Sequence, residues 1–324
     1  MKIGLIAHGA LPVPPRDWGA VEGTLWQRKR HLEQLGHTVD IANTRSIQDV
    51  IYAANRRGYD FVHCHCEAFV LECVAHLTRP FAVTSHFGGL HRFSPESPDA
   101  YEGFQYFFRD TLQAPALIVL SERIRQLYLR SGYAKLLRVL PNAVEVDDFH
   151  WSPRGNGKAV CVGVLSSRKR QAFVAEVVRD GPAVDFVGPR RQGHDGGFIE
   201  HETARYLGVW DKQTLYEHLT DYSCLVLLSE SEAAPKVVLE ACAAGLSVVI
   251  SEACTANLSA QPFITVLPDG LRDPHQIAQA IQAAIDANPS HRAAIRHYAK
   301  DRFDYPVVTR DYLRIIDEVR EYTP

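Results

Sequence analysis

Short apolar runs alternate with amphipathic segments along most of the chain, and this alternation restricts the fold more than any other feature. Runs that are apolar throughout are typical of strands covered on both faces, as in parallel sheets with helical crossovers. The sequence therefore predicts an α/β fold built from two parallel sheets. The expected strands lie at 2–7, 38–42, 60–64, 80–84, 116–120 and 136–140, and at 158–162, 183–188, 224–228, 247–250 and 263–266.

A polar, glycine-bearing stretch at 152–157 separates the two series of strands. With 324 residues, the chain is long enough for two compact domains. We expect a Rossmann-like domain at 1–150 and a second at 151–304, with Pro141-Asn142 as a turn signal shortly before the boundary. Apolar residues at helical spacing in 305–321 predict a terminal helix with one face to bury.

The charge balance argues against a nucleic-acid partner. The chain has 35 Lys and Arg against 38 Asp and Glu, and residues 1–150 contain 16 of each sign. The chain opens on a strand-like segment without the pattern of a signal peptide, and no run approaches the ~18 apolar residues of a membrane-spanning helix. Seven scattered cysteines do not resemble a disulfide framework. These features predict a cytoplasmic location.

The stretch 224–250 is the most informative local segment. An apolar strand at 224–228 leads into a loop with Glu232, and Pro235 is suited to the first position of a helix that contains Glu240. Glu240 then lies roughly 7.5 Å along the helix axis from Pro235. Two carboxylates can therefore reach different parts of one extended ligand at the carboxyl edge of a sheet. The alternative is that both carboxylates are solvated and complement the helix dipole.

Glu232, seven residues, Glu240 and then Ala-Cys-Ala-Ala-Gly resemble the E-x7-E signature of retaining family-4 glycosyltransferases. The resemblance implies the GT-B fold, in which two Rossmann-like domains face each other across a cleft and the terminal helix, here 305–324, packs back toward the first domain. It assigns the hydroxyls of the donor sugar to Glu232 and the ribose hydroxyls of the nucleotide to Glu240. Ala233 and Ala234 occupy the donor-binding positions where the family usually has Phe-Gly.

The expected phosphate site follows the first strand of the second domain. Gly163 is followed by three adjacent cations, and negative charge on a diphosphate leaving group requires such charges. The resemblance assigns contact with the donor phosphates to Arg168 and Lys169. Val164 occupies another position where the family can have Arg, and Arg170 stands where the family generally has Gly. Adjacent cations can equally be a solvated helix start.

Two further loops of the second domain are candidates for recognition of the nucleotide base. Gly188 follows the strand at 183–188, and Gly208-Val209 follows Tyr206. Glycines allow the backbone to approach a planar ligand closely, and both passages match the family pattern. The alternative is that they are ordinary turns.

The first domain carries further resemblances. Gly19 and Ala20 lie where the family has a Gly-Gly loop near the donor phosphates, and Glu22 is expected to structure the following helix rather than to bind ligand. Gly36 is expected just after the end of that helix. His86, in Thr-Ser-His, matches the family histidine close to the reacting sugar and is the candidate catalytic residue of this domain.

His63, Cys64, His65 and Cys66 suggest a zinc site by composition. Strand alternation sends the histidines to one face and the cysteines to the other, so the four side chains cannot converge on one ion. We therefore expect no metal here. The passage also matches a strand end of the glycosyltransferase family.

By resemblance, the reaction is transfer of a sugar from a nucleoside diphosphate sugar to an acceptor hydroxyl with retention, with His86, Arg168, Lys169 and Glu232 as catalytic residues. The chain has no Asp-x-Asp, which is consistent with a hexosyltransferase-like enzyme that uses no metal or other cofactor. Glycan, polysaccharide and glycolipid synthesis are the expected processes. The alternatives are a sugar-nucleotide epimerase, a phosphorylase, or an inactive module that binds a nucleotide sugar.

The acceptor is not specified by the sequence and could be a glycan, a lipid-linked molecule or a small molecule. Trp18, Trp26 and the cations at 28–30 could form an aromatic and basic edge, and so a peripheral membrane contact. The favoured alternative is that Trp26 packs in the core and that the cations form a solvated helix face.

Overall fold

The computed structural model describes residues 1–15, 19–91, 104–191 and 193–322. The chain folds into two compact units, of which one comprises Met1–Asn142 with Tyr305–Pro324 and the other comprises Ala143–Asp304. Each unit contains a six-stranded parallel sheet, in agreement with the predicted α/β fold.

The sheet of the first unit has the order β2-β1-β3-β4-β5-β6. Neighbouring strands are in parallel register, for example with Gly4 opposite Asp40 and Ile118 opposite Arg138. The strands are β1 (Lys2–Ala7), β2 (Thr38–Asn43), β3 (Phe61–Cys64), β4 (Phe81–Val83), β5 (Ala116–Val119) and β6 (Leu136–Val139). All six predicted strands of this half are confirmed.

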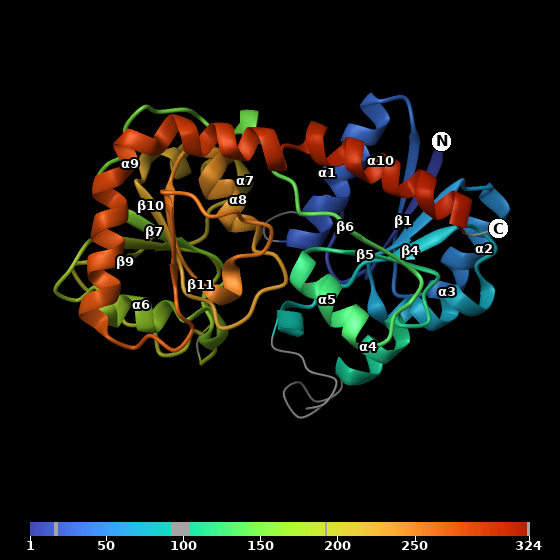
Figure 1. The fold of residues 1–324 in the computed structure, drawn as a ribbon, viewed down its shortest axis with the longest axis horizontal. Helices are drawn as coiled ribbons and strands as arrows, with labels where there is room; N and C mark the ends of the chain where they lie inside the picture. Colours follow the sequence, from blue (N-terminus) through green and yellow to red (C-terminus); the bar gives the residue numbers. More distant parts are fainter. Residues whose placement is uncertain (16–18, 92–103, 192, 323–324) are drawn as a thin grey trace. The chain divides into compact units, whose positions relative to one another are not determined.

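Helices surround this sheet (Figure 1). They are α1 (Ala20–Gln34), α2 (Ile47–Arg57), α3 (Val70–His76), α4 (Phe104–Thr111), α5 (Glu122–Arg130) and α10 (Tyr305–Tyr322). Gly36 follows α1 with φ +83°, the left-handed conformation expected of a glycine just beyond a helix end. Glu22 is buried in the first turn of α1, in agreement with a structural role.

The terminal helix α10 belongs to the first unit, as expected from the sequence. The hydroxyl of Tyr312 lies 2.8 Å from Nδ1 of buried His63, and Nε2 of His63 lies 2.8 Å from Oγ1 of Thr84. Thr84 donates its own proton to the carbonyl oxygen of Ile118, so His63 donates from Nε2 and accepts from Tyr312. A chain of hydrogen bonds therefore connects the terminal helix to β3, to the residue after β4 and to β5.

The sheet of the second unit has the order β12-β11-β10-β7-β8-β9. Its strands are β7 (Ala159–Val162), β8 (Val184–Val187), β9 (Ala204–Tyr206), β10 (Cys224–Leu227), β11 (Ser247–Ser251) and β12 (Ile264–Leu267). Strand β9 is absent from the expected set. Its three residues are too few for a recognisable apolar run, and Arg205 at its centre is exposed.

The helices of the second unit are α6 (Gln171–Val177), α7 (Lys212–His218), α8 (Lys236–Ala243) and α9 (Pro274–Phe303). Val174 of α6 and Ile281 of α9 pack in one cluster with sheet residues such as Phe186 and Val226. Pro235 is the residue before α8 and has an extended ψ of 108°, so the predicted start of this helix is early by one residue.

The boundary between the units lies earlier than residue 150. The backbone N–H of Val144 donates to the carbonyl oxygen of Phe303, and that of Val146 donates to Oδ1 of Asp304, at 2.9 and 3.2 Å. These bonds attach the segment after Asn142 to the end of α9, so the second unit begins at Ala143.

Arg292 of α9 is a buried cation without a carboxylate partner among the described residues. Its side chain is 1% exposed, and burial lowers its pKa to about 10, so it is charged at neutral pH. Its guanidinium donates to the carbonyl oxygens of Ser152, Thr220, Tyr222 and Ala244, to Oγ1 of Thr220 and to Oδ1 of Asn288. Arg292 therefore joins the end of α8, the turn before β10 and the segment before β7.

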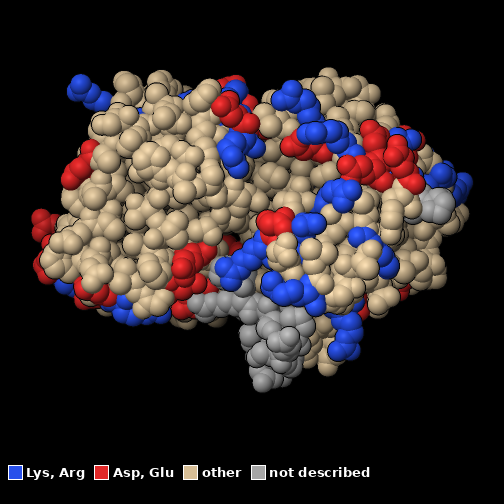
Figure 2. All heavy atoms as spheres, in the orientation of Figure 1, with Lys and Arg blue, Asp and Glu red and all other residues tan. Residues whose placement is uncertain are grey.

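All seven cysteines are free and buried. On the face drawn in Figure 2, Lys and Arg are interspersed with Asp and Glu on each unit, and the described residues form no broad surface of one sign. Within the described part of the chain, no helix is long and apolar enough to cross a membrane. Arg28 is buried against the ring of Tyr312 at 4.4 Å, so it is not part of an exposed basic edge, and Trp18 lies outside the described residues.

Candidate active site

The loop after β7 brings the expected phosphate-binding cations back over Gly163. Ser166 begins a 3-10 turn, Ser167–Lys169, and its side chain accepts a hydrogen bond from the backbone N–H of Lys169. A Cβ at Gly163 would lie 3.3 Å from Cδ of Lys169, so the glycine leaves room for this side chain to pass. Arg170, which ends the turn, has φ +57°, and this explains why glycine suits the position.

Gly188 is required where β7 and β8 end. It has φ +138°, and a Cβ there would lie 2.2 Å from the carbonyl oxygen of Gly163. Its backbone N–H donates to the carbonyl oxygen of Gly208, which follows β9. The predicted glycines at 163, 188 and 208 therefore adjoin at the carboxyl edge of neighbouring strands.

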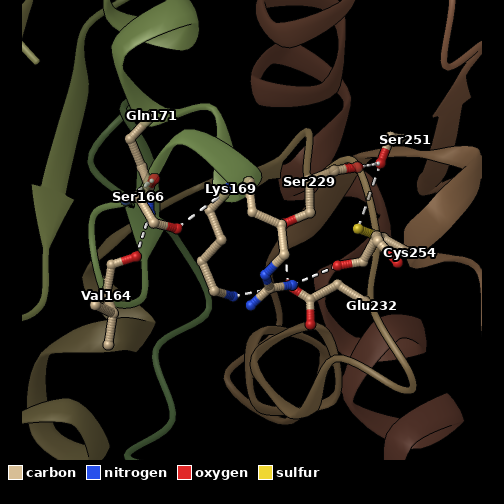
Figure 3. A network of polar contacts seen from close by, with 10 residues as sticks. Val164, Ser166, Lys169, Gln171, Ser229, Glu232, Ser251 and Cys254 are labelled. Carbon is tan, nitrogen blue, oxygen red and sulfur yellow. Dashed lines mark hydrogen bonds and ion pairs between the residues drawn. The ribbon is translucent and has the colours of Figure 1, made fainter. Parts of the chain in front are cut away.

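The loop after β10 carries Glu232 to the same edge. Oε1 of Glu232 lies 2.9 Å from Nζ of Lys169, 3.0 Å from a guanidinium nitrogen of Arg168 and 3.0 Å from Oγ of Ser229. Figure 3 shows Lys169 and Glu232 pointing toward one another from the two loops. Among the described residues, Oε2 of Glu232 accepts no hydrogen bond. One oxygen is therefore held by the protein, and the other can accept a bond from a ligand.

The charges around Glu232 keep it ionised. Its side chain is 11% exposed, and burial by itself would raise its pKa. The positive charges of Lys169 and Arg168 and the hydrogen bonds from Lys169 and Ser229 outweigh burial, so the pKa lies below its usual value. Arg168 also donates to the carbonyl oxygen of Ser231, which fixes the loop next to Glu232.

A buried polar layer supports this loop. Oγ of Ser251, at the end of β11, donates to the carbonyl oxygen of Ser229 at 2.6 Å and lies 3.4 Å from Sγ of Cys254 (Figure 3). Burial raises the pKa of Cys254 to about 12, so the thiol is neutral at physiological pH. Cys254 therefore packs as an uncharged group and does not compete with Glu232 for the cations.

Glu240 lies in α8 and is paired with Lys212, the first residue of α7. Nζ of Lys212 donates to Oε1 of Glu240, and the carboxylate side chain is 9% exposed. Burial would raise the pKa of Glu240, but the charges of Lys212 and Lys236 and the bond from Lys212 lower it below its usual value. Glu240 is therefore an ionised carboxylate.

In the first unit, the expected site residues are His86, shortly after β4, and Gly19, just before α1. Nε2 of His86 lies 2.9 Å from Nδ1 of His65, and burial together with the charge of Arg28 lowers the pKa of His86 to about 3. His86 is thus a neutral hydrogen-bonding group. Gly19 caps α1 in an extended conformation, and a Cβ there would lie 2.9 Å from Cβ of Pro15.

Strand alternation correctly separates the histidines and cysteines near β3. The rings of His63 and His65 lie with centroids 3.9 Å apart, whereas Cys64 interacts with Cys73 and with the carbonyl oxygen of Cys66. Among the described residues, no cluster of three or more His, Cys, Asp and Glu side chains could hold a metal ion.

The second unit brings together Gly163, Arg168, Lys169, Gly188 and Glu232 at one sheet edge. Three other expected donor-binding residues lie in the loops of this unit: Ala233 is buried in the loop before α8, Ala234 follows it, and Val209 is 52% exposed after β9.

Three residues of this region were not among the sequence candidates. Ser229 and Ser251 hold the loop with Glu232, and Lys212 holds Glu240. Asp211 before Lys212 is a helix N-cap signal that could have placed Lys212 in a first turn. The pairing of Lys212 with a residue 28 positions away depends on the sheet order and has no local signal.

Two family models match the chain. The model of Glycosyltransferase Family 4 matches residues 43–148, and that of Glycosyl transferases group 1 matches residues 199–302. The chain is a GT-B glycosyltransferase of the family-4 type. No curated protein sequence matches this glycosyltransferase significantly.

Solved structures show how widely this fold is shared. A sucrose-phosphate synthase from Thermosynechococcus elongatus has a TM-score of 0.78 at 16% identity, over 98% of each chain. Anabaena HepE in complex with UDP and glucose has a TM-score of 0.75 at 15% identity, over 98% of this glycosyltransferase and all of that chain. A glycosyltransferase involved in avilamycin A biosynthesis has a TM-score of 0.70 at 14% identity, over 99% of this glycosyltransferase and 98% of that chain. At these identities the likeness establishes the fold.

Proposed function

We propose that this glycosyltransferase moves a sugar from a nucleoside diphosphate sugar to an acceptor hydroxyl with retention and without a metal. The observation that carries the proposal is the arrangement of Arg168, Lys169 and Glu232 at the carboxyl edge of the second sheet, where Oε1 of Glu232 holds the two cations and Oε2 accepts no bond from the described residues. Ligands of open α/β sheets bind at this edge.

The two cations match the charge that develops in the reaction. When the bond between the anomeric carbon and the diphosphate oxygen breaks, its electron pair remains on the diphosphate, and Arg168 and Lys169 stabilise this negative charge. The acceptor oxygen forms the new bond on the same face of the sugar, and its proton passes to a phosphate oxygen of the donor. No side chain is needed as the base.

The two glutamates have separate roles in this proposal. Oε2 of Glu232 accepts hydrogen bonds from hydroxyls of the donor sugar, while its Oε1 keeps Arg168 and Lys169 in place. Glu240 accepts from the ribose hydroxyls. His86, which the first unit keeps neutral, donates or accepts a hydrogen bond at the sugar without adding a charge.

We propose UDP as the first candidate for the nucleotide, because HepE, which shares this fold, was solved in complexes with UDP and with UDP-glucose. Sugar hydroxyls on the acceptor, in a glycan or a glycolipid, are the acceptor class to examine first. A cytoplasmic location, with or without a peripheral membrane contact, belongs to the same proposal.

Thermal stabilisation by UDP, GDP, ADP and CMP tests the donor site. A nucleotide at ~100 times its dissociation constant stabilises the fold by about 2.7 kcal/mol. We expect one diphosphate to raise the melting temperature of the wild type and not of Glu240→Ala. Glu232→Ala should keep nucleotide binding and lose transfer from the matching nucleotide sugar. Transfer that survives both substitutions would refute the proposal.

A further inference from the structure

We propose that Lys212 is a donor-binding residue that recognises the ribose together with Glu240 and makes the enzyme select ribonucleotides over 2′-deoxyribonucleotides. This inference rests on the proposed function, because it assigns the nucleotide ribose to Glu240. It goes beyond the sequence motif, which contains the carboxylate and not the cation.

The geometry places the ammonium on the solvent side of the carboxylate. The side chain of Lys212 is 49% exposed and that of Glu240 is 9% exposed, so a ligand that approaches from solvent can contact both groups. Oε1 of Glu240 accepts the bond from Lys212, and within the described residues Oε2 accepts none. An ammonium has three donors, so the bond to Glu240 leaves others for a ligand.

Local structure holds Lys212 in this position. Asp211 caps α7 by accepting a bond from the backbone N–H of Thr214 at 2.8 Å, which fixes the first turn that carries Lys212. Nζ of Lys212 also lies 5.4 Å from the ring centroid of Tyr216, one turn further along α7. Such a cation–π contact limits the positions that the ammonium can take.

The pair complements the chemistry of a vicinal diol. Each ribose hydroxyl is both a donor and an acceptor, whereas a carboxylate can only accept and an ammonium can only donate. Glu240 therefore satisfies the hydroxyl protons, and Lys212 satisfies a hydroxyl oxygen. A deoxyribose lacks one of these hydroxyls and leaves part of the charged pair without its ligand partner.

The charge of Lys212 also reduces the cost of covering Glu240. A bound nucleoside removes water from the carboxylate, and an ionised group without a partner is expensive to desolvate. Lys236, four residues before Glu240 in α8, is a second cation near it and lowers its pKa as well. Lys212 differs from Lys236 because it donates directly to the carboxylate oxygen.

The test uses the full chain and compares the dissociation constants of the best-binding nucleoside diphosphate and its 2′-deoxy counterpart by isothermal titration calorimetry. In Lys212→Met, we expect the ribonucleotide to bind about tenfold more weakly, because a hydrogen bond to a charged group is lost. The preference for ribose over deoxyribose should fall by a similar factor. Lys212→Arg, which keeps the charge and donors, should retain most of both.

Lys158→Met is the matched control, because Lys158 precedes β7 and so lies at the opposite edge of the same sheet. Lys158→Met should leave the dissociation constants of both the nucleoside diphosphate and its 2′-deoxy counterpart unchanged. Melting curves without ligand show whether each variant is folded, and α7 is exposed enough to tolerate the change.

Two results would overturn the inference while leaving the proposed function intact. The first is a Lys212→Met variant with unchanged affinity and unchanged preference for ribose. The second is tighter binding by Lys212→Met, which would show that the lysine competes with the ribose for Glu240. If the wild type binds no nucleoside diphosphate, the proposed function fails, and the inference fails with it.

Discussion

Replacement of Arg292 by Met should destabilise the second unit by about 3 kcal/mol. The substitution removes a buried guanidinium that donates to four backbone carbonyl oxygens, those of Ser152, Thr220, Tyr222 and Ala244. Met has a similar length and keeps the apolar packing, but it has no donor. Each carbonyl left without a donor costs about 1 kcal/mol or more. The carbonyl oxygen of Ala244 keeps its bond from Oγ1 of Thr220, so the other three give the total.

The assay is urea unfolding followed by tryptophan fluorescence, because Trp151 and Trp210 both lie in the second unit. Hydrogen exchange measured by mass spectrometry should show faster exchange in α8, whose last carbonyl oxygens are bound by Arg292 and by Arg296. Arg272→Met is the control, since this exposed arginine donates only to nearby loop carbonyls.

Arg292→Lys separates charge from hydrogen bonding. Lysine keeps the positive charge but offers three donors from a single atom, so it cannot reach all the oxygens that the planar guanidinium reaches. We expect it to recover less than half of the lost stability. A loss below about 1 kcal/mol for Arg292→Met would refute the reasoning, because it would mean that water or neighbouring groups satisfy the carbonyls.

The remaining predictions concern the loops around the site. Gly188→Ala should lower the free energy of unfolding by roughly 3 kcal/mol, because the new Cβ meets the backbone of Gly163. Gly208→Ala, with φ +82° and open space around its Cβ, should lower it by about 1 kcal/mol. Equal losses in urea unfolding would contradict the role of the clash. Arg170→Gly should be about 1 kcal/mol more stable than Arg170→Ala, because φ at this position is +57° and glycine adopts this conformation without strain. Both variants lack the guanidinium, so equal melting temperatures for the two would count against left-handed strain. The lowered pKa of Glu232 means that its ionised form stabilises the fold above its usual pKa of 4.5 and that this contribution is lost as the pH falls through the lower, folded value. Glu232→Gln should therefore be less stable than the wild type at pH 7, and the difference should shrink in acid; a difference that grows on acidification would disprove this.

Most of the architecture could be predicted because each strand is a local apolar run. The exception, β9, is a three-residue strand at the edge of the sheet, where one face is exposed and Arg205 stands at its centre. Its pairing with β8 comes from the sheet and not from its own composition.

In the candidate site, too, some residues have a local signal in the sequence and others are brought together only by the fold. Gly163, Gly188 and Glu232 are recognisable because backbone conformation and spacing along the chain leave a pattern in the sequence. The pair of Lys212 and Glu240 joins two helices that become neighbours only after the sheet has formed. Arg28 likewise belongs to a basic run in the sequence, yet the fold buries it against Tyr312.

The position of α10 has a consequence for the order in which the protein matures during synthesis. Tyr312 of α10 supplies the hydrogen bond to Nδ1 of His63, and α10 packs against α1. In the chain, however, α10 follows the whole second unit. The ribosome therefore delivers the second unit before it delivers the last piece of the first. Until α10 emerges, His63 of the nascent first unit lacks its hydrogen-bond partner, and an apolar face of that unit is uncovered. This interval is therefore the time at which the first unit is most exposed to aggregation and to chaperones.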